Sequence, residues 1–203
     1  MLDPRDRPRA LRFMKPKIIR HPRHRLPAGS VRLCRVALIL VSAFAFGMPA
    51  DADSPAKSAV IDDCVYDGDA AAQAAWRPMR GSLPVATATL SGGKVLRLPC
   101  NFAPGQIERA SWDRAVQLDL AASRGIQFKV LCRNSSPVSY FSLYFQSGEG
   151  WYHAAFFPES ATDWETIEIN KSEMTSEGKP AGWNKIQTIR ISAWRGKNMN
   201  TEF

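Results

Sequence analysis

Apolar and polar side chains alternate with a period of two along most of the chain after residue 93, in runs that end near glycine, proline or asparagine. This pattern is typical of strands that bury one face, and short strands between such turns indicate an all-β fold. The alanine-rich stretch 69–76 predicts one short helix. About eight strands in this length suit two packed antiparallel sheets, a β-sandwich with a jelly-roll order. The predicted strands lie at 60–65, 94–99, 115–120, 125–133, 138–146, 151–157, 164–170 and 188–194.

The alternation also predicts which side chains form the core. If Phe141 faces inward, then Tyr140 and Tyr144 face outward, and Arg190 and Trp194 do so in the last long strand. A register error of one residue would turn a whole strand inside out. The predicted core side chains are Leu96, Leu98, Val116, Leu118, Leu120, Ile126, Phe128, Val130, Phe141, Leu143, Phe145, Ile167, Ile169, Ile189 and Ile191.

Residues 1–52 predict a basic leader and a secretory signal peptide. An apolar run at 36–46 follows two arginines and precedes Ala50-Asp51-Ala52, a small-residue pattern that fits a cleavage site. The run is shorter than the roughly 20 residues that span a bilayer, which argues against a membrane anchor. Residues 53–59 then form a connector, and 60–203 form the β-sandwich domain. We expect a secreted or periplasmic protein with no membrane contact after cleavage.

The formal net charge of +8 belongs to the leader. Residues 1–52 hold eleven lysines and arginines against three aspartates, so residues 53–203 hold sixteen basic and sixteen acidic side chains. The folded part is therefore neutral and lacks the basic surface that nucleic-acid binding requires. We expect no nucleic-acid partner.

Three cysteines, Cys64, Cys100 and Cys132, remain after the leader, in what the leader predicts to be an oxidising compartment. They allow one disulfide with three possible pairings, or three buried thiols, and the sequence does not choose between these alternatives. No C-x-x-C spacing occurs in the chain, which weakens metal and redox interpretations.

The last residues, 200–203, resemble the beginning of a further strand. The last strand of a jelly roll usually returns beside the first, so we expect the domain to be truncated at its last strand and to precede a further domain. The alternative is that these residues are a natural tail.

An enzyme needs titratable groups that can be brought together, and the part after the leader contains a single histidine, His153. No nucleophile elbow, metal-binding histidine pair or phosphate-binding loop occurs. A carboxylate glycosidase needs only two acids, and Glu149 and Glu177 lie in glycine-containing turns that a sandwich could bring together. Acidic residues beside glycine are more often solvated turn residues. A catalytic function is therefore the weaker expectation.

The aromatic side chains are the strongest indication of function in the sequence, because all six tryptophans lie after the leader. An outward face that mixes flat rings with arginine, glutamine and serine suits a sugar, whose C–H face stacks on a ring while its hydroxyls bind fixed polar groups. For any single ring, packing is the stronger expectation, and a cation–π pair of Arg190 with Trp194 without a ligand is the alternative for these two residues; the cluster as a whole favours binding. The predicted sugar-binding residues are Tyr144, Gln146, Trp151, Trp183, Arg190 and Trp194.

Four acidic residues lie in one turn-rich stretch, and their oxygens are ligands that calcium prefers. They do not follow the spacing of a D-x-D-x-D-G calcium loop, so a solvated turn is the stronger interpretation of this stretch. We therefore expect no cofactor. The candidate calcium ligands are Asp62, Asp63, Asp67 and Asp69.

Five segments resemble the galactose-binding-like N-terminal β-sandwich domains of large secreted planctomycete-type bacterial proteins: "LRLPCNF" (96–102), "ERASWDR" (108–114), "LYFQSGEGWY" (143–152), "EGKPAGW" (177–183) and "IRISAWRG" (189–196). Similar domains often precede glycoside-hydrolase-like or other catalytic domains. The resemblance covers about residues 58–203 and implies an accessory role near carbohydrate, with a downstream catalytic domain as partner. It brings no established set of binding residues.

The sequence therefore predicts a non-catalytic carbohydrate-binding or accessory module of an exported polysaccharide-processing protein, with a glycan as partner. Two alternatives belong to other classes. One is a structural domain that packs against a downstream catalytic domain, and the other is a carboxylate glycosidase.

Overall fold

The computed structural model describes residues 59–79 and 81–203. The predicted leader at 1–52, and all of the predicted connector except its last residue, lie outside the described residues. The chain divides into two units, of which one includes everything from Cys64 to Phe203 and the other ends at Asp63. Residues 59–63 contain no helix or strand. Every element described below belongs to the unit from Cys64 to Phe203.

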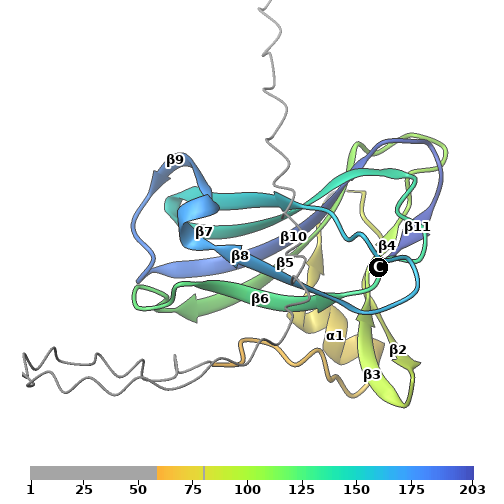
Figure 1. Ribbon diagram of the computed structural model, residues 1–203, viewed down its shortest axis with the longest axis horizontal. Helices are drawn as coiled ribbons and strands as arrows, with labels where there is room; N and C mark the ends of the chain where they lie inside the picture. The colour runs from red at the N-terminus through yellow and green to blue at the C-terminus, as the bar shows by residue number, and fades with distance from the viewer. Residues whose placement is uncertain (1–58, 80) are drawn as a thin grey trace, which may run out of the picture. The chain divides into compact units, whose positions relative to one another are not determined.

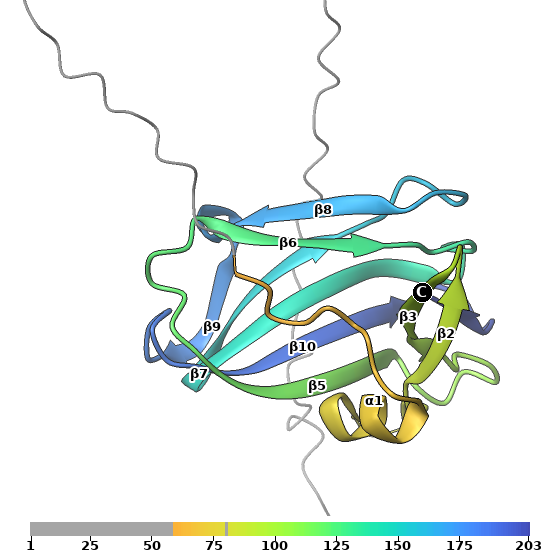
Figure 2. The same ribbon diagram turned by 90° about the horizontal axis from the view of Figure 1, so that it is seen from below.

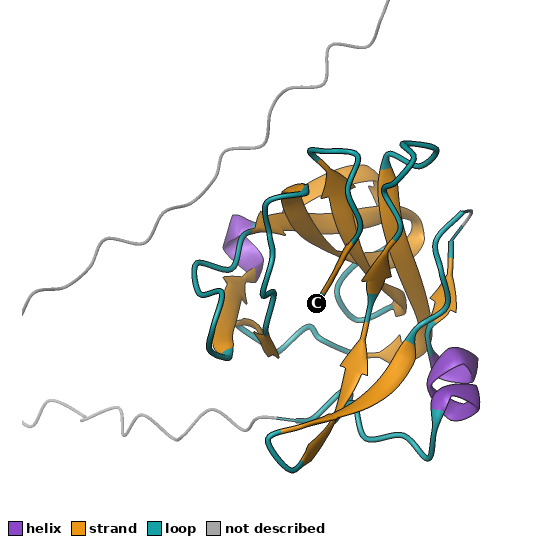
Figure 3. Cartoon of the chain, turned by 90° about the vertical axis from the view of Figure 1, so that its right-hand side faces the viewer, coloured by secondary structure: helices purple, strands orange, loops and turns teal. Residues whose placement is uncertain are grey.

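Strands account for most of this unit (Figure 1, Figure 3). The α-helix α1 (Asp69–Ala75) and the 3-10 helix η1 (Lys171–Glu173) are its described helices. No helix within 59–79 and 81–203 has the length and apolar character needed to cross a membrane. The fold is all-β, as the alternation predicted. Its strands are β1 (Arg77–Pro78), β2 (Ala86–Leu90), β3 (Gly93–Arg97), β4 (Pro99–Cys100), β5 (Arg109–Leu118), β6 (Gly125–Val130), β7 (Val138–Phe156), β8 (Glu165–Asn170), β9 (Thr175–Pro180), β10 (Ile186–Arg195) and β11 (Thr201–Glu202).

Five strands form one antiparallel sheet in the order β1-β5-β10-β7-β9. Strand β7 reverses direction within its own length. The evidence is that the rings of Tyr144 and His153 lie only 5.2 Å apart, whereas nine residues of extended chain would separate them by about 30 Å. The reversal falls near Gly148, whose φ of 59° is the left-handed conformation that tight hairpin turns use. The first arm of β7 pairs with β10 and the second arm pairs with β9 (Figure 2).

The hydrophobic core lies on one face of this sheet, which we call the inner face. The pair β6–β8 forms a second layer over it (Figure 2). Phe128 of β6 packs edge-on against Phe156 at 5.0 Å, and Phe156 stacks on Phe141 at 5.5 Å. Burying each such ring stabilises the fold by about 1.5–3 kcal/mol. The two layers give the unit a sandwich-like character.

Two further strand pairs, β2–β3 and β4–β11, complete the unit. Helix α1 is joined to β2 through the Asp69 carboxylate, which accepts hydrogen bonds from the backbone N–H and the hydroxyl of Thr87 at 2.6 and 2.7 Å. These bonds lower the pKa of the Asp69 carboxyl. Strand β11 leads to Phe203, whose ring packs edge-on against Trp112 and Phe141 on the inner face.

The predicted register is confirmed, because Phe141 and Phe145 are fully buried on the inner face while Tyr140 and Tyr144 point to the opposite side. The strand predicted at 60–65 is wrong: these residues form no strand, Val60 is 83% exposed, and Cys64 has a φ of 58° that extended chain does not adopt. Asp62 and Asp63 are consecutive, so a strand here would carry a carboxylate in the middle of each face and neither face would be apolar.

Candidate ligand-binding face

The side of the five-stranded sheet opposite to the core, which we call the outer face, carries rows of aligned side chains. Residues paired across antiparallel strands point to the same side, so the register of the strands fixes each row. Three rows cross β5, β10 and β7: Asp113, Arg190 and Tyr144; Ser111, Ser192 and Ser142; and Arg109, Trp194 and Tyr140.

The serine row forms the floor between two rows of large side chains. Ser111 and Ser192 share a hydrogen bond between their hydroxyl oxygens at 2.8 Å, and the indole N–H of Trp194 donates to the hydroxyl of Ser142 at 3.0 Å. All three serines are buried. Their small size lets the long side chains on both sides lean over them, and their hydroxyls provide the partners that buried polar groups require.

An ion pair joins β10 to β5 in the first row. Arg190 donates from Nε and Nη2 to the two carboxylate oxygens of Asp113, at 2.6 and 2.7 Å, and the side chains are 14% and 23% exposed. The guanidinium also lies over the ring of Trp151, 4.4 Å from its centroid. Bidentate pairing and ring stacking together fix the plane of the guanidinium.

Trp194 stands between two neighbours in the third row. The guanidinium of Arg109, on β5, lies over its ring at 4.9 Å, and the ring of Tyr140, on β7, stacks on it at 5.4 Å with an angle of 22° between the planes. Because β5 and β7 flank β10 on opposite sides, these contacts occupy both faces of the indole. Its edge, rather than a face, is available to a ligand.

Aromatic contacts continue onto the second arm of β7. Tyr144 stacks on His153 and meets Trp151 edge-on at 6.1 Å. Burial lowers the pKa of His153, and the nearby carboxylate of Glu177 partly opposes that shift. Burial likewise raises the pKa of Tyr140, with Tyr144 adding to the rise and Arg109 opposing it. At neutral pH both groups are therefore uncharged polar groups.

The structure brings five of the six predicted sugar-binding residues to the outer face: Tyr144, Gln146, Trp151, Arg190 and Trp194. Gln146 accepts a hydrogen bond from the hydroxyl of Thr188 at 2.8 Å. Trp183 lies on the other side, stacked on Tyr152 at 4.1 Å and tilted against the core ring of Phe145. The alternative of a cation–π pair between Arg190 and Trp194 is not what the structure shows, since the guanidinium over the Trp194 ring is that of Arg109.

Arg109 and Asp113 are residues of this face that the sequence analysis missed. The strand predicted at 115–120 extends over Arg109–Leu118 in the structure. The sequence contains the signal, because Ala110 and Trp112 alternate with the polar residues Arg109, Ser111 and Asp113, as the residues of a strand with one apolar face do.

The candidate catalytic acids lie at one edge of the sheet, where Glu149 of β7 pairs with Lys179 and Glu177 of β9 pairs with Trp151. Glu149 and Glu177 are exposed, and neither lines the two cavities described below. Asp67 forms an exposed ion pair with Lys94, and Asp69 binds Thr87. Within the described residues, no three His, Cys, Asp or Glu side chains lie close enough together to hold a metal ion.

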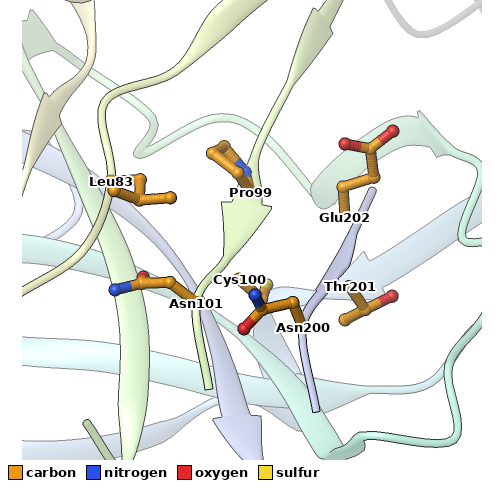
Figure 4. A pocket seen from close by; sticks show the side chains of 7 residues that line it. All are labelled: Leu83, Pro99, Cys100, Asn101, Asn200, Thr201 and Glu202. Atoms are coloured by element: carbon orange, nitrogen blue, oxygen red, sulfur yellow. The ribbon is translucent and has the colours of Figure 1, made fainter. Parts of the chain in front are cut away.

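Two cavities lie away from the outer face. One, of about 350 Å³, lies beside β4 and β11 and is lined by Asn101, Asn200 and Glu202 among others (Figure 4). The other, of about 410 Å³, is lined by residues of β2, β3 and the segment before α1. Within the described part of the chain, the side-chain oxygen of Asn101 is buried without a hydrogen-bond donor. Because that atom is shielded from solvent, it offers no open contact to a ligand.

All three cysteines of the unit are thiols. Cys100 and Cys132 are buried, and the thiol of Cys132 points to the carbonyl of Glu202 at 3.7 Å. Burial raises the pKa of both thiols, and the proximity of Cys132 adds to the rise at Cys100. Cys64 is half-buried. The two buried thiols act as small core side chains.

Comparison of the sequence with protein-family models and with curated proteins finds no match. The function must therefore be inferred from the side chains of the outer face themselves.

Proposed function

We propose that the outer face binds carbohydrate and that the protein is a non-catalytic accessory module of an exported polysaccharide-processing system. The observation that supports this proposal most strongly is the convergence of rings and fixed polar groups on one sheet face, with Trp151 and Tyr140 beside Arg190 and Gln146. Sugars are bound by this combination, because their C–H faces stack on rings while their hydroxyls need donors and acceptors. The jelly-roll order, the galactose-binding-like resemblance and export by the leader belong to the same proposal.

The ring contacts suggest which side chains a sugar would stack on. Trp194 has both faces occupied, so we assign it to the support of the site rather than to stacking. Trp151 has Arg190 over one face and Tyr144 at its edge, and Tyr140 has Trp194 on one face. The second faces of Trp151 and Tyr140 have no further ring or cation over them among the residues that the structure describes. These two rings are the proposed stacking platforms.

The polar groups between the rings are held in place before any ligand binds. Arg190 is fixed by Asp113 and Trp151, and the amide of Gln146 is fixed by Thr188. A side chain that is already ordered loses little conformational entropy when it binds a ligand, whereas a mobile one costs about 0.5–1.5 kcal/mol. This order favours recognition of a ligand over a merely solvated surface.

A docking surface for another protein domain would use some of the same rings, and it is the main competing function. The two functions predict different results with isolated sugars, since only the first gives binding without a protein partner. The purified protein is applied to an array of plant, algal and bacterial oligosaccharides, and each positive is confirmed by calorimetry.

The decisive variant is Trp151→Ala. It should abolish sugar binding while the protein remains folded, because Trp151 is half-buried on the outer face and contributes less to the core than the inner rings. Trp164→Ala is the matched control, since Trp164 is 43% exposed just before β8, in the other layer. Retained binding in Trp151→Ala, or equal loss in both variants, would contradict the assignment. An array without any positive would favour the docking function.

A further inference from the structure

The two arginines of the outer face differ in what they bind. Each lies over a tryptophan ring, Arg190 over Trp151 at 4.4 Å and Arg109 over Trp194 at 4.9 Å. Arg190 has its own carboxylate, Asp113, in bidentate contact. Arg109 donates no side-chain hydrogen bond and forms no ion pair with any residue in 59–79 or 81–203. It is a half-buried, permanently charged group without a carboxylate partner in the described chain.

The stacking on Trp194 leaves the hydrogen-bonding edge of Arg109 open. A guanidinium carries its five N–H donors around the rim of its plane, so a ring against its face blocks none of them. Two of these donors are spaced to match the two oxygens of a carboxylate, which is the geometry that Asp113 already provides for Arg190. A ligand carboxylate would make the same arrangement with Arg109.

The charges around Arg109 favour an anion. Arg77 lies on β1 opposite Asp113 and is exposed, so the β1–β5 edge of the outer face carries two arginines, while its one carboxylate is held by Arg190. The acidic residues Glu149 of β7 and Glu177 of β9 lie at the other edge of the sheet, where these two strands pair. This side of the outer face therefore carries a net positive charge, and Arg109 belongs to it, beside the indole of Trp194, on which the ring of Tyr140 stacks.

We propose that the saccharide bound by the outer face is acidic, and that Arg109 binds the carboxylate of a uronic acid residue. This inference rests on the proposed carbohydrate-binding function and specifies its ligand class. The sugar ring next to the carboxylate lies against the open face of Tyr140, and Trp194 holds the guanidinium in the orientation that the carboxylate needs. Arg109 is thus the residue that selects acidic over neutral sugars.

The test compares two ligands that differ only in their carboxylates. Tetragalacturonate and its carboxyl-reduced form are titrated into the full chain by calorimetry, at about 20 mM and about 200 mM salt. The acid should bind about tenfold more tightly or better, because hydrogen bonds between charged groups are worth about 1.5–3 kcal/mol. The preference should shrink at the higher salt concentration.

Variants at Arg109 assign the preference to this residue. Arg109→Gln should bind the two tetrasaccharides equally, and Arg109→Lys should keep part of the preference because it retains the charge but loses the fork. Arg133→Gln is the matched control, since Arg133 is an exposed arginine after β6, and it should behave as the parent protein. If Arg109→Gln does not fold, Arg109→Lys and the preference of the parent protein decide the question.

Several outcomes would overturn the inference. Equal affinity of the parent protein for both tetrasaccharides refutes it while leaving carbohydrate binding intact. A preference that persists unchanged in folded Arg109→Gln or Arg109→Lys assigns the selection to another residue. A sulfated tetragalactoside that binds as tightly as tetragalacturonate contradicts recognition of a carboxylate. Absence of binding to every one of these sugars refutes this inference, and the oligosaccharide array then decides separately on the proposed function.

Discussion

Replacing Asp113 with alanine should destabilise the protein more than the loss of an ordinary surface ion pair. The change removes both carboxylate oxygens that Arg190 binds, at 2.6 and 2.7 Å from its nitrogens, from a side chain that is only 14% exposed in the parent protein. Breaking a fully buried pair by removing one partner costs about 3–5 kcal/mol. Because water can reach part of both groups here, and the guanidinium keeps its contact with Trp151, we expect about 2–3 kcal/mol.

The assay is urea unfolding followed by circular dichroism, with the midpoint temperature as a second measure. A loss of this size should lower Tm by about 5–10 °C in a domain of this length. Asp113→Asn keeps one acceptor oxygen and should cost less. A double-mutant cycle with Arg190→Met isolates the pair and should give a coupling energy of about 2 kcal/mol.

Asp67→Ala is the control, because its carboxylate is fully exposed and pairs with Lys94 at 3.3 Å. Exposed pairs of this kind contribute little, so the control should unfold like the parent protein. An Asp113→Ala variant as stable as Asp67→Ala would refute the reasoning. It would mean that the outer face relaxes without Asp113, and that Arg190 is not held in place as the proposed binding site requires.

The remaining predictions concern packing and thiols. Gly150→Ala should lower the free energy of unfolding, measured with urea, by at least about 2 kcal/mol, since a Cβ there would lie 2.3 Å from the nitrogen of Pro180. Gly92→Ala is the control: the space around Gly92 is open, so only its positive φ should cost stability, by about 1 kcal/mol. Iodoacetamide at pH 8 should label Cys100 and Cys132 only after unfolding, and earlier labelling of either would contradict their burial. Because their pKa values are raised in the folded state, stability should fall as the pH rises above about 8.5; pH-independent stability there would count against those shifts.

The alternation of side chains was sufficient to predict the faces of the long strands. Phe141, Leu143 and Phe145 are buried, and Tyr140 and Tyr144 point the other way, because period two is set by the geometry of the strand itself. The same rule would have placed Arg109 and Asp113 had the strand been traced back through the buried Ala110 and Trp112. Polar residues alternate with these two, so the beginning of β5 has few apolar residues and resembles a loop.

Trp183 shows where periodicity gives no information. It follows β9, whose sequence "TSEGKP" contains no apolar residue and was not predicted as a strand. Its ring is placed by the path of the loop after Pro180, which turns it toward Tyr152 and Phe145. A loop residue has no alternating neighbours to fix its side, so its position depends on tertiary packing that a single sequence does not reveal.

The rows of the outer face depend on register between strands, which alternation within one strand cannot supply. Asp113 lies opposite Arg190, and Arg109 lies opposite Trp194. If β5 were shifted by two residues along β10, every side chain would stay on its own face, yet Asp113 would no longer face Arg190. The observed register assigns the carboxylate of β5 to Arg190 and leaves Arg109 over a ring. The availability of Arg109 for an acidic ligand is therefore a consequence of strand pairing. A variant that moved the acid from position 113 to position 111, next to the row of Arg109, should pair with Arg109 from within the protein and weaken binding of tetragalacturonate in calorimetry; unchanged affinity in the folded variant would contradict this reasoning.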